Sequence, residues 1–247
     1  MSDKEAASPL WISHRGLKEH AVENTFEAFT NAVEAGFTAL ETDLRLSKDN
    51  HIVLSHDATL ERLAGDSRCV AELTRTELEG IQLRGGGRLF FLEQFMSEFR
   101  SSNWSFDIKP EHGKRTIKTL AKLLEHVYPE KASGAKIRFC TWRRNHEQLL
   151  TQNFPQAAYY ARKAECWQAG LAVFLGAPGW GRIKAGRTYA IPPRYGGISL
   201  FRKSFVEHYH CRGARTIAFL PRRDSEAEAA LLANFDEILT DGRILDA

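Results

Sequence analysis

Short apolar segments rich in β-branched and aromatic residues alternate along this chain with longer segments of helical period. Residues 10–13 have the composition of a strand. Residues 25–36 have the spacing of an amphipathic helix. Gly36 stands where that helix is expected to end, because glycine readily adopts the left-handed conformation of a C-cap. The residues expected on one face of this helix are Phe26, Phe29, Ala32 and Val33.

The same alternation continues to the end of the chain. Further strands are predicted at 38–42, 51–56, 104–108, 136–140, 157–161, 188–192, 216–220 and 237–240. Helices are predicted at 114–127, 143–153, 164–175, 200–212 and 224–235. Strands separated by helices pair in parallel, and about eight of them close into a single (β/α)8 TIM barrel. The alternative is an open doubly wound sheet, but no GxGxxG motif follows the first strand.

One long segment, residues 57–90, interrupts the alternation before the apolar sequence LFFLEQFMSEF. We interpret it as an insertion that lies over the mouth of the barrel. The sequence RGGGR at 84–88 lacks the spacing of a phosphate-binding loop and is expected to form a turn. Because the chain has no tandem repeat, low-complexity tract or linker, residues 1–247 are expected to form one domain.

Composition narrows the class of protein. The net charge of +3 is small for 247 residues, and the basic residues are scattered, so nucleic-acid binding through a broad basic face is not expected. The N-terminus is polar, and no apolar run approaches the roughly 18 residues of a membrane span. We therefore expect a soluble cytoplasmic protein; its oligomeric state is left open.

Four cysteines lie far apart in the sequence, without a CxxC pair. This spacing favours reduced, mostly buried thiols over a disulfide framework or a zinc site. The four residues are Cys69, Cys140, Cys166 and Cys211.

Two acidic residues stand two positions apart on a predicted strand. Alternate residues of a strand point to the same side, so Glu41 and Asp43 are expected to project together into the mouth of the barrel. Converging carboxylates repel each other unless a cation lies between them, and Mg²⁺ or Ca²⁺ is the usual one. Asp107 ends the next core strand and strengthens the metal interpretation. The alternative is that arginines such as Arg45 bridge the acids.

Candidates for proton transfer and phosphate binding also follow β-rich segments. The candidates for proton transfer are His14 and His56, because imidazole is the side chain best suited to remove a proton on one ring and donate one from another. Taken singly, each histidine has a structural alternative as a hydrogen-bonded residue. Arg15 and Lys109 are placed to bind phosphate oxygens, to neutralise the nearby acids, or to do both.

Five sequence motifs resemble those of the glycerophosphodiester phosphodiesterases, in the same order and at similar spacing. They are SHRG, ENTFEAF, ALETDLRLSKD, IVLSHDATLERL and FDIKP. The resemblance is dense over residues 11–110 and returns at EILTDG. It implies a (β/α)8 barrel with an insertion after the second strand, which agrees with the interruption at 57–90.

The resemblance also implies roles for individual residues. It places one divalent cation, Mg²⁺ or Ca²⁺, on Glu41, Asp43 and Asp107. The other implied site residues are the acid/base pair His14 and His56, the phosphate-binding residues Arg15 and Lys109, and Glu23 and Asn24 close to the site. Asn24 has a second interpretation as a helix N-cap, because Glu27 three residues later completes a pattern similar to a capping box.

The implied reaction is the hydrolysis of a glycerophosphodiester to glycerol 3-phosphate and an alcohol, in lipid and glycerol metabolism. A neighbouring hydroxyl attacks phosphorus, and the resulting cyclic phosphate is opened by water; we favour His56 as the first base. The alternatives are a lysophospholipase D-like or phosphodiester lyase activity on the same fold, or an inactive phosphate-ester binding protein.

Two departures from the family pattern stand out. The family usually has glutamate where this chain has Asp107, which is one methylene shorter. The tryptophan common near the seventh strand is absent, and Phe219 is the nearest aromatic residue. Elsewhere, Trp180 has two interpretations: it lines a substrate channel or it packs in the core.

Overall fold

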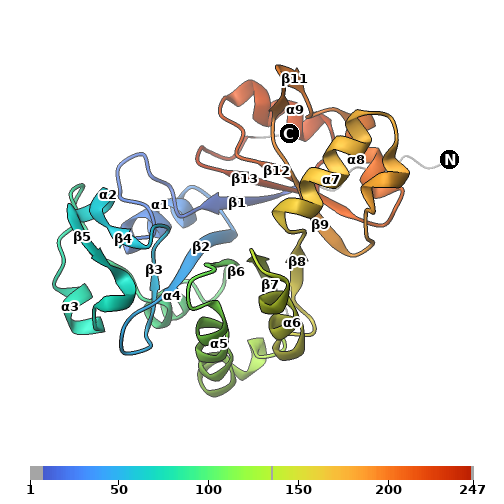
Figure 1. Ribbon diagram of the computed structural model, residues 1–247. Coiled ribbons are helices and arrows are strands. Elements are labelled where there is room, and N and C mark those ends of the chain that lie inside the picture. The colour runs from blue at the N-terminus through green and yellow to red at the C-terminus, as the bar shows by residue number, and fades with distance from the viewer. Residues whose placement is uncertain (1–7, 135, 246–247) are drawn as a thin grey trace. The chain divides into compact units, whose positions relative to one another are not determined.

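A computed structural model describes residues 8–134 and 136–245, in which strands and helices alternate along the chain (Figure 1). The alternating strands are β1 (Leu10–His14), β2 (Ala39–Leu46), β6 (Asn103–Ile108), β7 (Ile137–Thr141), β8 (Ala158–Tyr160), β9 (Arg187–Ile191), β12 (Arg215–Phe219) and β13 (Glu237–Thr240). The helices between them are α1 (Phe26–Glu34), α4 (Leu92–Glu98), α5 (Gly113–Val127), α6 (Arg144–Asn153), α7 (Lys163–Phe174), α8 (Lys203–His210) and α9 (Asp224–Leu232). This is the element order of a (β/α)8 barrel, and the predicted boundaries are close to the observed ones.

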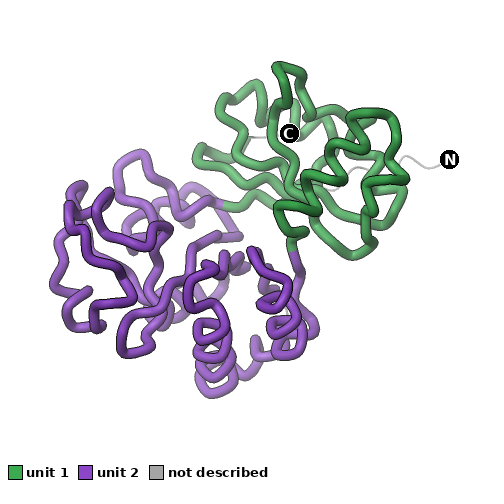
Figure 2. Tube along the Cα trace, viewed as in Figure 1, with its two compact units in different colours: residues 1–12, 160–247 green, residues 13–159 purple. Residues whose placement is uncertain are grey.

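The chain divides into two compact units, drawn in purple and green in Figure 2. The N-terminal unit comprises residues 13–159, and the C-terminal unit comprises residues 1–12 and 160–247, of which 8–12 and 160–245 are described. That residues 1–247 form one domain stays a prediction.

In the N-terminal unit, four strands pair in parallel in the order β2-β6-β7-β8. The register sets Asp43 of β2 beside Asp107 of β6. Aromatic rings fill the space beside these strands, and the ring centroids of Phe29 and Phe95 lie 4.8 Å apart in an edge-to-face contact. The packed core therefore fixes β2, which carries Glu41 and Asp43, against β6.

Helix α1 has a narrower buried face than the sequence pattern predicts. Ala28, Phe29 and Ala32 are buried. Phe26 and Val33 are 43% and 42% exposed, so the prediction that they share the buried face is wrong. These two positions lie at the edges of the apolar stripe, where a short helix on a curved sheet leaves them partly in solvent.

Between β2 and α4 the chain forms a small substructure with its own apolar core. Strand β3 (Ile52–Leu54) returns antiparallel to β2. It is followed by β4 (Thr59–Leu60), α2 (Glu61–Ala64), β5 (Asp66–Cys69), η1 (Val70–Glu72) and α3 (Arg75–Glu79). Members of the core include Val53, Leu60, Val70, Leu78 and Phe91. The predicted turn at 84–88 is confirmed, with positive φ angles at Gly86 and Gly87.

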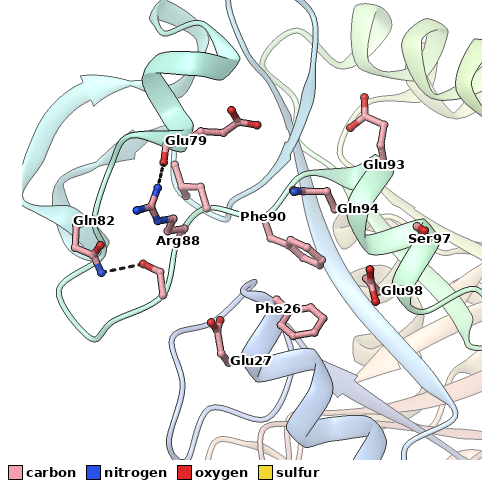
Figure 3. Close-up of a pocket in the computed structure, with 12 residues that line it drawn as sticks. Phe26, Glu27, Glu79, Gln82, Arg88, Phe90, Glu93, Gln94, Ser97 and Glu98 are labelled. Atoms are coloured by element: carbon pink, nitrogen blue, oxygen red, sulfur yellow. Dashed lines mark hydrogen bonds between the residues drawn. The ribbon is translucent and has the colours of Figure 1, made fainter.

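A groove opens beside this substructure, between α1 and α4 (Figure 3). Its lining includes the carboxylates of Glu27, Glu93 and Glu98 and the rings of Phe26 and Phe90. None of the predicted catalytic, metal-binding or phosphate-binding residues lines it. The groove is therefore separate from the candidate active site.

In the C-terminal unit, β9, β12 and β13 pair in parallel. A short hairpin, β10 (Arg194–Tyr195) with β11 (Ile198–Ser199), precedes α8. The single-turn helix η3 (Pro178–Gly181) follows α7. Among the helices of the described residues, none is both long enough and apolar enough to cross a bilayer.

No disulfide joins the four cysteines within the described residues, as predicted. Their predicted burial is wrong, because Cys211 is exposed and the other three are half-buried. Sequence spacing indicates whether thiols can pair but says little about their depth.

Candidate active site

Lys109 joins two aspartates from neighbouring strands. It follows the end of β6, and its Nζ lies 2.7 Å from Asp43 Oδ1 and 2.6 Å from Asp107 Oδ2. All three side chains are buried or nearly so. The parallel register brings the like charges of Asp43 and Asp107 together, and the ammonium group between them offsets their repulsion.

Asp43 has two further partners from the loop between β1 and α1. Arg15 Nε lies 3.0 Å from Asp43 Oδ2, and Asn24 Nδ2 donates to the same oxygen at 3.0 Å. Burial raises the pKa of Asp43, but the positive charges of Lys109 and Arg15 outweigh burial, so the pKa is lowered. Asp43 is therefore held ionised.

Asn24 is not a helix N-cap. Thr25 is the N-cap of α1, and its Oγ1 accepts a hydrogen bond from the backbone N–H of Ala28 at 3.3 Å. The Asn24 side chain turns instead to β2, where its Oδ1 also accepts from Thr42 Oγ1 at 2.8 Å. Its φ of 58° lies in the left-handed region, which asparagine tolerates better than most residues. Of the two interpretations, the one placing Asn24 near the predicted site fits the structure.

Glu41 lies beside these pairs without sharing them. It is 8% exposed, and its Oε2 has no hydrogen-bond partner within the described residues. Burial raises its pKa well above the usual value, and the nearby charges of Asp43 and Asp107 raise it further. Three carboxyl groups thus face two cations, Arg15 and Lys109, which leaves one negative charge uncompensated whenever Glu41 ionises.

The donor chemistry of these residues fits a divalent cation. Carboxylate oxygens are the ligands that Mg²⁺ and Ca²⁺ prefer, and an orphaned buried oxygen such as Glu41 Oε2 calls for a positive partner. In the described part of the chain, no three His, Cys, Asp or Glu side chains are grouped to hold a metal ion. Asp43 and Asp107 pair with Lys109 instead, so the predicted ligand set stays a prediction.

Arg45 does not bridge the acids. Its guanidinium donates to the backbone carbonyl of His56 at 2.7 and 3.0 Å and pairs with Glu111 at 2.9 Å. The alternative in which Arg45 neutralises Glu41 and Asp43 is therefore wrong: Arg15 and Lys109 pair with Asp43, and Lys109 also pairs with Asp107.

His56 reaches the site through a hairpin. Its expected place at the carboxyl end of a parallel strand is wrong, because β3 runs antiparallel to β2. Strand β2 continues past Asp43, β3 folds back along it, and the Ser55 N–H donates to the Asp43 carbonyl at 3.1 Å. His56 Nδ1 lies 2.7 Å from Asp57 Oδ1. A carboxylate on Nδ1 orients the ring and leaves Nε2 for proton transfer.

His14 ends β1 and is 8% exposed. The next residue is bound to β2, since the Arg15 N–H donates to the Glu41 carbonyl at 3.1 Å. The two predicted proton carriers thus differ in setting: His14 is buried next to the acids, whereas the side chain of His56 is 39% exposed.

Arg62 was not predicted from the sequence, although it lies in the IVLSHDATLERL motif. Its guanidinium donates to Glu23 Oε1 at 2.7 Å and to Asp57 Oδ2 at 2.6 Å. Glu23 in turn accepts from Arg15 at 3.2 Å. Arg62 therefore links the carboxylate that orients His56 to the one that holds Arg15.

Trp142 is a second residue that was not predicted. It directly follows β7, its indole Nε1 donates to Asp107 Oδ1 at 2.9 Å, and its ring centroid lies 5.7 Å from Lys109 Nζ. The side chain is 50% exposed. An aromatic residue two positions after a predicted strand was the available signal. By contrast, Trp180 is 79% exposed, so its interpretation as a core residue is wrong.

Solved structures with the same fold cover nearly the whole chain. The glycerophosphoryl diester phosphodiesterase domain of an uncharacterised Mycobacterium tuberculosis protein has a TM-score of 0.78 at 16% identity, over 95% of this chain and 96% of that one. An Oleispira antarctica phosphodiesterase, solved with its product sn-glycerol-3-phosphate, has a TM-score of 0.73 at 20% identity, over 95% and 93%. The predicted (β/α)8 TIM barrel is confirmed.

Sequence comparison leads to the same family. A glycerophosphodiester phosphodiesterase of Caldanaerobacter subterraneus is 24% identical over 239 residues, which are 94% of this chain and 93% of that protein. A lysophospholipase D of Rattus norvegicus is 45% identical over 67 residues, or 27% and 21% of the two chains. The sequence model of the glycerophosphoryl diester phosphodiesterase family matches residues 14–243. The chain therefore belongs to this family of enzymes, as its sequence motifs predicted.

Proposed function

We propose that the protein hydrolyses glycerophosphodiesters to sn-glycerol 3-phosphate and an alcohol, with one divalent cation. The observation that carries the proposal of a cation is the buried oxygen of Glu41, which has no hydrogen-bond partner among the described residues and lies beside Asp43 and Asp107. Family membership and the product bound by the Oleispira antarctica phosphodiesterase support the class of substrate.

The residues that would hold the cation are Glu41, Asp43 and Asp107, and Mg²⁺ or Ca²⁺ suits their oxygen donors. Such a cation lowers the pKa of the attacking hydroxyl and neutralises charge on the phosphoryl oxygens. Lys109 pairs with one oxygen of each aspartate, and a carboxylate can accept such a hydrogen bond while it binds a cation. Lys109 would then lie beside the cation, where its ammonium group can bind a phosphate oxygen.

The histidines carry the protons. His56 Nε2 takes the proton from the glycerol hydroxyl next to the ester, and the oxygen of that hydroxyl forms a bond to phosphorus. The bond from phosphorus to the alcohol oxygen breaks, and His14 gives that oxygen its proton. Water then opens the cyclic phosphate, with His14 removing a proton from water and His56 returning one to the glycerol oxygen. Arg15 binds the phosphate oxygens, and Glu23 and Asn24 hold Arg15 and Asp43 in place.

The direct test is an assay with glycerophosphocholine and glycerophosphoethanolamine, in which glycerol 3-phosphate and the released amine are measured separately. We expect product with added Mg²⁺ or Ca²⁺ and none in excess chelator. Undiminished activity in chelator contradicts the metal proposal, and the absence of product with both substrates and each metal contradicts the substrate class.

Substitution of each histidine tests the acid/base assignment. His14→Ala and His56→Ala are each expected to reduce the rate at least about a hundredfold, with unchanged circular dichroism. Accumulation of cyclic phosphate in either variant would identify the second half-reaction as the one impaired. Turnover close to that of the wild type in both variants contradicts the assignment.

A lysophospholipase D-like activity is the second candidate. The 67-residue segment that is 45% identical to a lysophospholipase D favours it over a lyase or an inactive binding protein. Replacing glycerophosphocholine by lysophosphatidylcholine in the same assay distinguishes the two hydrolases, because choline release then accompanies lysophosphatidate and not glycerol 3-phosphate. Release of cyclic phosphate as the final product would indicate the lyase, and tight binding without turnover the inactive binding protein.

We also propose a cytoplasmic location and a role in lipid and glycerol metabolism. Four cysteines that form no disulfide with one another suit a reducing compartment. Cell fractionation measures the location, and we expect the native protein to fractionate with cytoplasmic markers. Accumulation of the protein outside the cell contradicts this proposal.

A further inference from the structure

Exposed apolar side chains are concentrated in one stretch of the C-terminal unit. Among the described residues, twelve large hydrophobic side chains are exposed, and six of them lie between residues 167 and 198. These six, here called the aromatic surface, are Trp167 (55% exposed), Leu171 (44%), Leu175 (66%), Trp180 (79%), Tyr195 (41%) and Ile198 (46%). Single exposed apolar residues are ordinary, but such a concentration marks an interaction site.

Contacts join the elements that contribute these residues. The ring centroids of Trp167 on α7 and Tyr195 on β10 lie 5.8 Å apart, and Tyr195 pairs with Ile198 across the hairpin. Gln168 Nε2 donates to the Trp180 carbonyl at 3.0 Å, which ties η3 to α7. The six side chains therefore belong to one continuous part of the unit.

Helix α7 is apolar on two faces. Ala169, Ala172 and Val173 are buried on its inner face, whereas Trp167 and Leu171 are exposed on another. A helix that packs one face on a core normally has polar residues on its outer side. About half of the surface of Trp167 and of Leu171 stays in water, and the unfavourable hydration of this apolar surface indicates an external apolar partner.

The surrounding sequence is strongly basic. Residues 160–220 contain ten Lys or Arg and two Glu, although the whole chain has a net charge of only +3. Lys163, Arg182 and Arg194 are exposed and come from the same elements as the aromatic surface or from residues next to them. The partner must therefore accept apolar side chains and carry negative charge at its rim.

We propose that the aromatic surface docks on the interface of a bilayer that contains anionic phospholipids. Tryptophan and tyrosine favour the headgroup level of a membrane, where the ring is buried and its N–H or O–H stays hydrated. Leu171 and Leu175 enter the acyl boundary, and the basic rim attracts anionic headgroups. The protein then associates peripherally with the membrane surface.

A second copy of the chain fits this surface less well. A two-fold dimer would place the same patch on both sides of the interface, so the basic rims would face each other. Like charges at an interface oppose association, whereas an anionic bilayer complements them. This inference goes beyond the proposed hydrolysis and holds or fails without it.

The test is co-sedimentation of the full-length protein with vesicles. We expect the protein to pellet with vesicles of equal parts phosphatidylcholine and phosphatidylglycerol, much less with phosphatidylcholine alone, and less at high salt. The double variant Leu175→Asp/Trp180→Ala is expected to reduce the bound fraction at least about tenfold, because it removes two exposed apolar groups and adds a negative charge. Its hydrolysis of glycerophosphocholine in solution should match that of the wild type.

Leu232→Asp is the matched control, since Leu232 is 80% exposed in the same unit and lies outside the aromatic surface. This variant should bind vesicles nearly as the wild type does. Wild-type protein that stays in the supernatant with both kinds of vesicle overturns the proposal, as does a double variant that binds undiminished. A wild-type dimer in solution that the double variant converts to monomer would assign the surface to a second copy instead.

Discussion

The two units of the molecule use charge in opposite ways. In the N-terminal unit, the charged groups of the candidate site are buried and paired with one another, as Lys109 is with Asp43 and Asp107. In the C-terminal unit, exposed Lys and Arg come from the same or adjoining segments as exposed aromatic and aliphatic side chains. Buried, paired charges hold a small substrate and move protons at defined atoms, because burial strengthens each interaction and fixes its geometry. Exposed charges beside apolar groups suit a large and deformable partner.

Glu41 is the exception within the N-terminal unit, and its removal is expected to have the largest effect. Glu41→Gln keeps the size of the side chain but cannot supply a carboxylate to a cation. We expect activity to fall about a thousandfold, which corresponds to several kcal/mol of transition-state stabilisation. The measurement is kcat/KM with saturating Mg²⁺ or Ca²⁺, together with the metal affinity by titration calorimetry. Glu98→Gln, an exposed glutamate in the same unit, is the control and should retain full activity.

Substitution of Arg62 tests whether the network of ion pairs in the N-terminal unit extends from the candidate site into the insertion. Arg62→Ala removes the links to Asp57 and Glu23, so kcat is expected to fall about tenfold through misplacement of His56 and Arg15. Arg62→Lys should restore part of the loss. Arg68→Ala removes a comparably exposed arginine that pairs with Asp66, away from the predicted site residues, and it should leave kcat unchanged. Equal activity in Arg62→Ala and Arg68→Ala contradicts the link.

Substitution of Trp142 tests how much one hydrogen bond to Asp107 contributes. Asp107 is one methylene shorter than the glutamate usual in the family. Trp142→Phe keeps an aromatic ring near Lys109 but removes the donor to Asp107 Oδ1. We expect kcat/KM to fall about threefold to tenfold, with weaker metal binding, because Asp107 loses a fixed orientation. Trp180→Phe, in the C-terminal unit, should have no effect on a substrate in solution. An unchanged metal affinity in Trp142→Phe would rule out this role.

The smallest expected effect is that of Glu41→Gln on stability. The substitution is expected to stabilise the folded protein, although it lowers activity. The pKa of Glu41 is raised in the folded protein, so the folded state binds its proton more tightly than the unfolded state does. Stability from this group is complete below the usual glutamate pKa and is lost as pH rises through the folded-state value. In chelator, Glu41→Gln should therefore unfold a few degrees higher than the wild type at pH 8, and the difference should shrink towards pH 4. A variant less stable than the wild type at pH 8 would mean that ionised Glu41 has a partner.

Much of the fold could be predicted because it depends on local patterns. Strands such as β6 and β13 were predicted to within about one residue, since β-branched and aromatic runs differ clearly from the helical segments around them. Patterns predict exposure less well, as Phe26, Val33 and Cys211 illustrate. The exposure of those side chains depends on how far a neighbouring element extends, and local spacing in the sequence does not encode that.

The site was predictable where the strand itself sets the direction of a side chain. Glu41 and Asp43 follow from alternation along β2, and Asp107 follows from the parallel register with β6. Arg62 and Trp142 were missed because their contacts to Asp57 and Asp107 span turns and a crossover helix. His56 stays a predicted site residue, but its expected place at the end of a parallel strand is wrong, because β3 runs antiparallel to β2.

The sequence by itself determined the class of fold, the family and the residues able to carry its chemistry, because periodicity and short motifs are local properties of the chain. Only the tertiary structure decided which charges pair, that Asn24 turns from the helix end to Asp43, and that Glu41 is left with an oxygen unpaired among the described residues. It also decided that Trp167 and Trp180 stay in solvent. Pairing and burial depend on distances between segments far apart in sequence, and those distances exist only once the strands have assembled.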